Sequence, residues 1–298
     1  MMKKMNSIKK GFTLVELALA LVFVSVLLLT IAWLTIHLTT VYEKGLAMKA
    51  VNSVGKELVD DFSRAVAASP ALTVDSICSK KYNKSTRTEQ YNRCMNDSAR
   101  KFSYQQRYNK VKVAGVETVV PTNGVFCTGR YSYIWNSAYV LNETDYPRVP
   151  GGNSNYKATF NYSGGTNSNF RLLKVSDFNR ELCTEHMNNS EYVYDDSPVY
   201  TLSGLSPETN EELLENSENN LAIYDMSVFA PTVHELTSSA YYSGTFVLAT
   251  LRGGININST GEFCSDPPDN LNTDFAYCAI NKFNFAMKAD GEKLDSER

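Results

Sequence analysis

The chain carries a short basic segment followed by a long run without charge, and this order constrains the fold more than any other feature. Four lysines precede Gly11, and residues 17–42 contain no Asp, Glu, Lys or Arg. About 20 apolar residues in a helix span a bilayer, so this run of 26 is long enough to span one with some tilt. Because lysines favour the cytoplasmic side of a membrane, the residues after Tyr42 are expected outside.

A cleavage site is expected before the apolar run and not after it. A secretory signal has its small residue after the apolar region, whereas Gly11 stands in front of it. Cleavage after Gly11 would remove residues 1–11 as a leader and keep the hydrophobic helix. Phe12 would then be N-terminal, with Glu16 as the fifth residue of the mature chain.

The order of residues around this site carries a resemblance to a known family. Residues 9–16 read Lys-Lys-Gly-Phe-Thr-Leu-Val-Glu and precede the apolar run. This resembles the N-terminal signal of the type IV pilin-like family, and the resemblance is sharp over residues 8–69. It implies that a prepilin peptidase cleaves after Gly11 and methylates the amine of Phe12. It also implies assembly with other pilin subunits on a pilus assembly platform in the membrane.

Glu16 is an acidic residue at the edge of the apolar run. A carboxylate among lipid chains costs a few kcal/mol unless it is paired or lies at the interface. Glu16 could simply be tolerated at the membrane edge. We favour the alternative that the α-amine of Phe12 on a neighbouring subunit neutralises it when helices bundle. Trp33 and His37 lie toward the other end of the run, where amphipathic rings form an interfacial belt.

The helix is expected to continue beyond the membrane, so that residues 12–69 form one helix on the order of 87 Å long. Its second part, residues 43–69, is amphipathic, because apolar side chains recur every three or four residues. Gly45 and Gly55 weaken the helix by roughly 1 kcal/mol each relative to Ala, and Pro70 ends it. The stripe consists of Ala47, Val51, Val54, Leu58, Phe62 and Ala65. Charged side chains are expected on other faces, namely Lys49, Lys56, Asp60, Asp61 and Arg64.

The charge of the chain gives no sign of a nucleic-acid partner. The chain has 29 basic and 32 acidic side chains, and without the four leader lysines 25 basic side chains remain, a formal charge of −7. No block of basic residues follows the apolar run. Residues 70–298 are rich in Tyr, Asn, Ser and Thr, which predicts an exterior, β-rich globular domain with long loops.

Six cysteines all lie in this exterior part. An even number of cysteines in an exported chain predicts disulfides, and six allow 15 pairings. Proximity favours Cys78–Cys94 and Cys264–Cys278, which leaves Cys127–Cys183. A metal site is the alternative, but the chain has no C-x-x-C, and its closest Cys/His pair is Cys183 with His186. We therefore expect neither a metal nor a cofactor.

Alternating residues with many β-branched and aromatic side chains predict the strands. These are residues 111–120, 131–141, 157–162, 170–175, 223–229, 245–251, 255–258 and 276–289. Short helices are expected over residues 86–102 and 206–216, the second with Ser206 as N-cap and Pro207 at its first position. The expected fold is α+β: a long N-terminal transmembrane and amphipathic helix packed on an antiparallel β-sheet in a large disulfide-stapled exterior domain, which is the lollipop architecture of pilins.

Catalysis has little support in the sequence. There is no G-x-S-x-G, H-E-x-x-H or P-loop signature, and His186 and His234 have no triad context, so no enzyme is expected. Residues 266–274 supply carboxylate and amide oxygens that calcium would accept, but they lack the order of an EF-hand. A solvated loop closed by Cys264–Cys278 is the preferred interpretation.

Two further segments resemble one branch of the family. Residues 171–175 and 245–258 resemble strands of the larger minor pilins, the J-type pseudopilins and W-type pilins, with residues 279–286 as a closing strand. One function follows from the resemblance: a structural minor subunit of a pilus, a secretion pseudopilus or a DNA-uptake pilus. The alternative is an exported adhesin at the pilus tip that uses the pilin signal for delivery. Both imply a single-pass membrane protein with a cytoplasmic leader and a periplasmic or extracellular domain.

Overall fold

The computed structural model describes thirteen segments of the chain. They are residues 13–70, 85–90, 104–113, 116–141, 156–162, 165–167, 170–177, 182, 199–201, 210–214, 221–233, 240–251 and 278–289.

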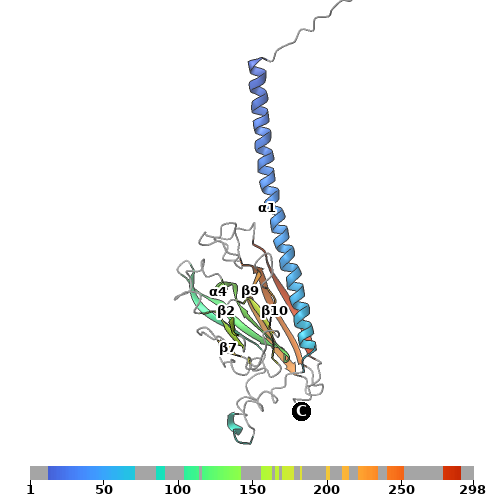
Figure 1. Ribbon diagram of the computed structural model, residues 1–298, viewed down its shortest axis with the longest axis vertical. Coiled ribbons are helices and arrows are strands. Elements are labelled where there is room, and N and C mark those ends of the chain that lie inside the picture. Colours follow the sequence, from blue (N-terminus) through green and yellow to red (C-terminus); the bar gives the residue numbers. More distant parts are fainter. Residues whose placement is uncertain are drawn as a thin grey trace, which may run out of the picture.

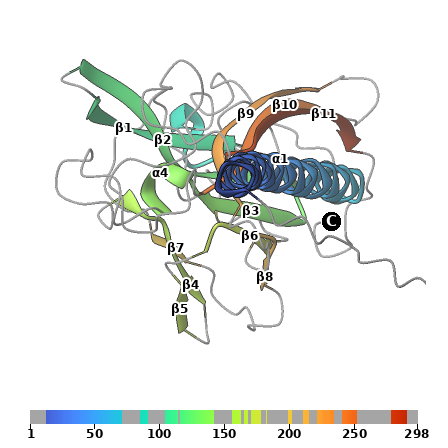
Figure 2. The same ribbon diagram turned by 90° about the horizontal axis from the view of Figure 1, so that it is seen from above.

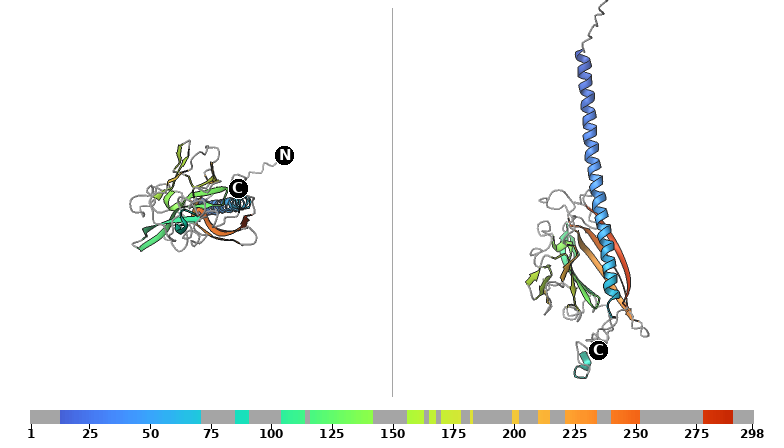
Figure 3. Two further views of the ribbon diagram at one scale, coloured as in Figure 1. Left: turned by 90° about the horizontal axis from the view of Figure 1, so that it is seen from below. Right: turned by 45° about the vertical axis from the view of Figure 1, so that its right-hand side comes forward.

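A single helix of 54 residues, α1 (Leu14–Ala67), dominates the shape of the molecule. At 1.5 Å per residue it is about 81 Å long. Figures 1 and 3 show from two sides that its N-terminal half projects away from the strands, whereas its C-terminal half lies along them. The expected long N-terminal helix is confirmed, and it is apolar and long enough to cross a membrane.

The strands form three sheets within the described residues. The largest has the order β1-β2-β3-β6-β8 and contains β1 (Tyr104–Val113), β2 (Val116–Cys127), β3 (Tyr131–Asn136), β6 (Leu172–Ser176) and β8 (Asn210–Glu212). A second has the order β11-β10-β9 and contains β9 (Leu221–Val233), β10 (Ala240–Thr250) and β11 (Ile280–Ala289). A small third sheet contains β4 (Thr159–Tyr162), β5 (Gly165–Asn167) and β7 (Val199–Thr201). All neighbouring strands are antiparallel except β4 and β7.

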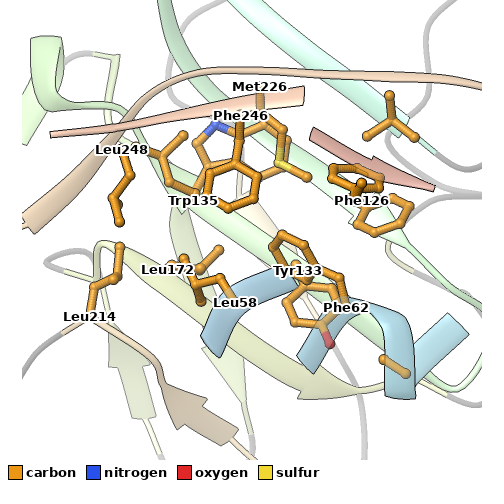
Figure 4. Close-up of a cluster of buried hydrophobic side chains, with 14 of the residues drawn as sticks. Leu58, Phe62, Phe126, Tyr133, Trp135, Leu172, Leu214, Met226, Phe246 and Leu248 are labelled. Carbon is orange, nitrogen blue, oxygen red and sulfur yellow. The ribbon is translucent and has the colours of Figure 1, made fainter. Parts of the chain in front are cut away.

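The C-terminal half of α1 lies between the two larger sheets. Seen from above, β9, β10 and β11 curve around one side of the helix, and β3 and β6 lie on another (Figure 2). The ring of Phe62 contacts aromatic rings from four strands, at centroid distances between 4.7 and 5.9 Å. These rings belong to Phe126, Tyr133, Phe246 and Phe285. Figure 4 shows Phe62 and Leu58 within the main core, which draws side chains from both sheets.

The predicted apolar stripe is the face of α1 that the sheets cover. Five of its six residues are buried, and Val54 is partly buried against the same core. Gly55 is also buried, because the ring of Phe283 on β11 lies where a Cβ would be. The burial begins at Ala47, so the preceding part of α1 has no cover in the described structure.

The end of α1 is tied to the turn between β2 and β3. The Ser69 hydroxyl donates to the Ala65 carbonyl at 2.6 Å and lies 3.1 Å from the Thr128 hydroxyl. The Arg130 amide donates to the same Ser69 oxygen at 3.2 Å. The turn needs Gly129, whose φ of 126° is rare for other residues.

Most predicted strands are found with shifted ends, and three predictions need correction. Residues 111–120 are not one strand, because β1 ends at Val113 and β2, its antiparallel partner, begins at Val116. The predicted strand 131–141 stops at Asn136 and gives way to the one-turn helix α4 (Ala138–Leu141). The predicted helix 206–216 is wrong over its described part, where β8 pairs with β6. There the Glu212 carboxylate accepts the amides of Arg171 and Leu172, so tertiary pairing overrides the helix-start pattern.

Other predicted elements lie partly or wholly outside the described residues. Only residues 88–90 of the predicted helix 86–102 are described as helical, and the predicted strand 255–258 is outside.

Candidate assembly and membrane helix

The first turn of α1 is closed by a reciprocal cap between Thr13 and Glu16. The Glu16 amide donates to the Thr13 hydroxyl at 3.3 Å, and the Thr13 amide and hydroxyl both donate to the Glu16 carboxylate at 2.9 Å. This is the Thr-x-x-Glu capping box. The spacing was visible in the sequence, and our sequence reasoning missed it. Gly11 and Phe12, the predicted cleavage site, lie outside the described residues.

The N-terminal half of α1 exposes apolar side chains all round. Every side chain from Leu14 to Thr39 is exposed, as a membrane-spanning segment would be in the absence of lipid. The rings of Trp33 and His37 stack 5.9 Å apart at an interplanar angle of 5°. The hydroxyls in this half donate to carbonyls three or four residues earlier, which removes unpaired donors from the lipid-facing surface. They belong to Ser25, Thr30, Thr35, Thr39 and Thr40.

The C-terminal half of α1 presents a polar face that runs from the edge of its contact with β11 to the exposed side of the helix. A groove of about 850 Å³ follows this face. It is lined by Lys49, Asn52, Ser53, Lys56, Glu57, Asp60, Ser63 and Arg64. One helix therefore offers two outward surfaces in succession, an apolar one and a charged one.

Asp61 departs from the predicted pattern, because it does not lie on a solvent face. Its carboxylate accepts from the Lys174 ammonium at 2.6 Å and from the Tyr133 hydroxyl at 2.8 Å. Both charged side chains are largely buried, with exposed fractions of 15% for Asp61 and 16% for Lys174. Asp61 precedes Phe62, and successive residues of a helix are 100° apart around its axis. Asp61 therefore lies at the edge of the apolar stripe, where it contacts β3 and β6.

Cys127 and Cys278 are the two cysteines among the described residues, and both are disulfide-bonded. Their partners lie outside the described residues, as do Cys78, Cys94, Cys183 and Cys264, so the predicted pairings stay predictions. The sulfur of Cys127 lies 3.0 Å from the Ser132 hydroxyl, which donates to the buried Asp177 carboxylate at 2.7 Å.

No group of three or more His, Cys, Asp and Glu side chains is placed to hold a metal ion within the described segments. His186, His234 and the acidic loop 266–274 all lie outside them. Comparison with known proteins adds no assignment: no family model matches the chain, and no curated protein or solved structure matches it.

Proposed function

We propose that the chain is a structural minor subunit of a type IV pilus or a related pseudopilus, and that it polymerises through α1. The observation that carries the proposal is the division of α1. An apolar half without cover follows a Gly-Phe-Thr-Leu-Val-Glu sequence, and the other half is built into a β-rich domain. A helix that is apolar all round needs lipid or other helices around it. Lipid surrounds this helix while the chain is in the membrane, and the helices of other subunits surround it in a filament.

The proposal includes the processing, topology and partners of the chain. A prepilin peptidase cleaves between Gly11 and Phe12, and the lysine leader stays cytoplasmic. The domain after α1 is exported, which suits the bonded state of Cys127 and Cys278. Other pilin subunits and the assembly platform are the partners, and the role is structural and not catalytic.

Mass spectrometry of the mature N-terminus tests the processing step. We expect a chain that begins at Phe12 with a methylated amine, since Gly11 is the small residue before the apolar run. Gly11→Leu should leave the leader attached. A mature chain that begins beyond residue 40, or filaments containing an intact leader, would exclude the assignment.

Two substitutions at Glu16 separate its charge from its cap. Glu16→Gln keeps an acceptor for the Thr13 amide but removes the charge, whereas Glu16→Ala removes both. A charge-assisted bond contributes about 1.5–3 kcal/mol, so both variants should enter filaments roughly tenfold less than wild type or worse. Immunoblots of sheared filaments against membrane fractions measure the incorporation. Cleavage and the stability of the exterior domain should not change, because Glu16 is roughly 75 Å from the end of α1.

The outcomes at Glu16 distinguish three situations. If only Glu16→Ala fails, the cap and not the ion pair matters. If both variants assemble like wild type, the pairing role is absent, which fits a subunit with no subunit ahead of it. That result would favour the alternative of an adhesin at the pilus tip.

A further inference from the structure

The contacts that hold α1 in the exterior domain differ in how strictly they fix its rotation. On the side of β10 and β11 the contacts are mostly between apolar side chains, and a hydrogen bond of 2.6 Å joins the amide side chains of Asn281 on β11 and Asn52. Apolar cores tolerate exchange and shifts of side chains if volume is kept. A stripe of Ala, Val, Leu and Phe therefore favours burial of one face without strictly selecting one rotation about the helix axis.

The contact with β3 and β6 is directional. Asp61 accepts from Lys174 and Tyr133 at 2.6 and 2.8 Å, and Arg64 lies 3.9 Å from the same carboxylate. The Lys174 ammonium also lies 4.8 Å from the centre of the Tyr131 ring. Because the ion pair is largely removed from water, loss of one partner leaves a poorly solvated charge.

A rotated helix would break this contact. A shift by one residue turns the helix surface by about 100°. Asp61 would then leave Lys174, and Lys56 or Ser53 would approach the stripe position. Such a state exposes part of the stripe and leaves Lys174 and the Tyr133 hydroxyl without their acceptor.

We infer that the Asp61–Lys174 ion pair, together with Tyr133, fixes the rotation of α1 about its axis and thereby sets which face of the helix the chain presents to neighbours. The rotation is a property of the single chain. Only its consequence for neighbouring subunits rests on the proposed function.

The test compares broken and replaced versions of the contact in the full chain in detergent. Asp61→Leu and Lys174→Met each leave one charge behind, so each should lower the midpoint of urea denaturation. The triple variant Asp61→Leu/Lys174→Met/Tyr133→Phe removes every polar partner and should regain the wild-type midpoint, since apolar replacement of a buried ion pair is often neutral or stabilising. Asp60→Leu, at an exposed neighbouring position, is the matched control and should change neither readout.

Rotation is read by photocrosslinking. A benzophenone amino acid is placed at position 53, which is exposed in wild type. Peptide mapping then detects crosslinks to β11. We expect background yield in wild type and in Asp60→Leu, and a severalfold rise in the triple variant. If the triple variant does not fold, Asp61→Asn keeps the shape without the charge and should show both a lower midpoint and a rise in yield.

Two results would overturn the inference. In the first, a folded triple variant, or Asp61→Asn in its place, gives no crosslinks to β11, so that the contacts with β11 fix the rotation, namely the fit of Phe283 over Gly55 and the hydrogen bond between Asn281 and Asn52. In the second, the single variants keep the wild-type midpoint, so that the pair contributes nothing. Both readouts come from the isolated chain, so they stand whether or not the chain assembles into filaments.

Discussion

Gly45 and Gly55 lower the stability of α1 equally by helix propensity, but only one of them is required by packing. At Gly45 a Cβ would meet nothing within 4 Å, so packing does not require the glycine. At Gly55 a Cβ would overlap the ring of Phe283. The sequence showed both as weak points of the helix, and only the position of Phe283 distinguishes them.

Substitution by alanine should therefore have opposite effects at the two positions. Gly45→Ala should raise the free energy of unfolding by up to about 1 kcal/mol through helix propensity. Gly55→Ala should lower it by about 1–3 kcal/mol, because the Phe283 ring must move. Denaturation of the two variants under the same conditions measures the difference. Equal effects of the two substitutions would contradict the described contact.

Buried tyrosines make the β-rich domain sensitive to alkali. Burial and the neighbouring Asp61 carboxylate raise the pKa of Tyr133 well above its ordinary value of 10.0, and burial also raises the pKa of Tyr104 and Tyr224. The unfolded chain ionises its tyrosines near pH 10, whereas the folded chain keeps these protons. Stability is thus fully present below about pH 10 and falls as the pH rises beyond it, by up to about 1.4 kcal/mol per pH unit and group.

Tyr133→Phe tests this contribution. The variant should lose about 0.5–2 kcal/mol at neutral pH with the hydrogen bond to Asp61. Its stability should then fall less steeply than that of wild type above about pH 10. Denaturation midpoints across this range give both quantities. Tyr42→Phe, at an exposed position on α1, serves as the control, and an identical slope in wild type and Tyr133→Phe would refute the assignment.

At the scale of elements, side chains join the edges of the two larger sheets. β1 and β9 are edge strands of different sheets within the described residues. The Met226 amide donates to the Gln106 side chain at 2.9 Å, and Gln106 donates to Asp225 at 2.6 Å. The Tyr104 hydroxyl donates to the Met226 carbonyl. Two side chains of β1 thus occupy the place that a further strand would take beside β9.

Gln106→Leu should open this junction. It leaves the Met226 amide without its acceptor, which costs about 1–3 kcal/mol for a buried donor. Hydrogen exchange at the Met226 amide should accelerate, while amides in the middle of β10 keep their wild-type protection. Gln90→Leu, at an exposed position, is the matched control. Unchanged exchange at Met226 would show that the side chain of Gln106 is not the acceptor.

The sequence predicted elements whose pattern is local and missed those decided by distant contacts. The stripe of α1 and strands such as β10 have a clear period, so their existence was predictable. The end of β1 and the start of β2 inside residues 111–120 have little sequence signal, because the sequence there has Val on both sides of Ala114 and Gly115. β8 and the inward position of Asp61 depend on Arg171 and Lys174, which are far away in sequence. At the candidate site, the cleavage motif stays a prediction, and the capping box was readable in the sequence but overlooked.

At the scale of the whole molecule, α1 belongs to two structural units at once. Its first half has no contact with the sheets, and its second half supplies Leu58 and Phe62 to the main core. The β-rich domain is therefore incomplete without residues that directly continue the exposed apolar half of α1.

Truncation should reveal this division. A chain that begins at residue 43 keeps every buried residue of α1 and should be soluble and folded. A chain that begins at residue 70 lacks Phe62 and should not fold, because deletion of one such side chain alone costs about 3–5 kcal/mol. Near-ultraviolet circular dichroism and size-exclusion chromatography distinguish the two. A folded chain that begins at residue 70 would show that the sheets close without the helix.

The packing of β11 against α1 also determines when, during synthesis of the chain, the apolar face of the helix can be covered. Asn281 donates to Asn52 across 229 positions of sequence, so the strand that covers the helix is synthesised long after the helix itself. If the chain crosses the membrane from its N-terminal end, the apolar face of α1 is exposed to water until β11 has also crossed. Contacts of such long sequence separation form slowly, and exposed apolar surface invites aggregation in the interval. On that route the chain would be most prone to aggregation during export, and a chaperone that covers residues 47–66 would protect it then.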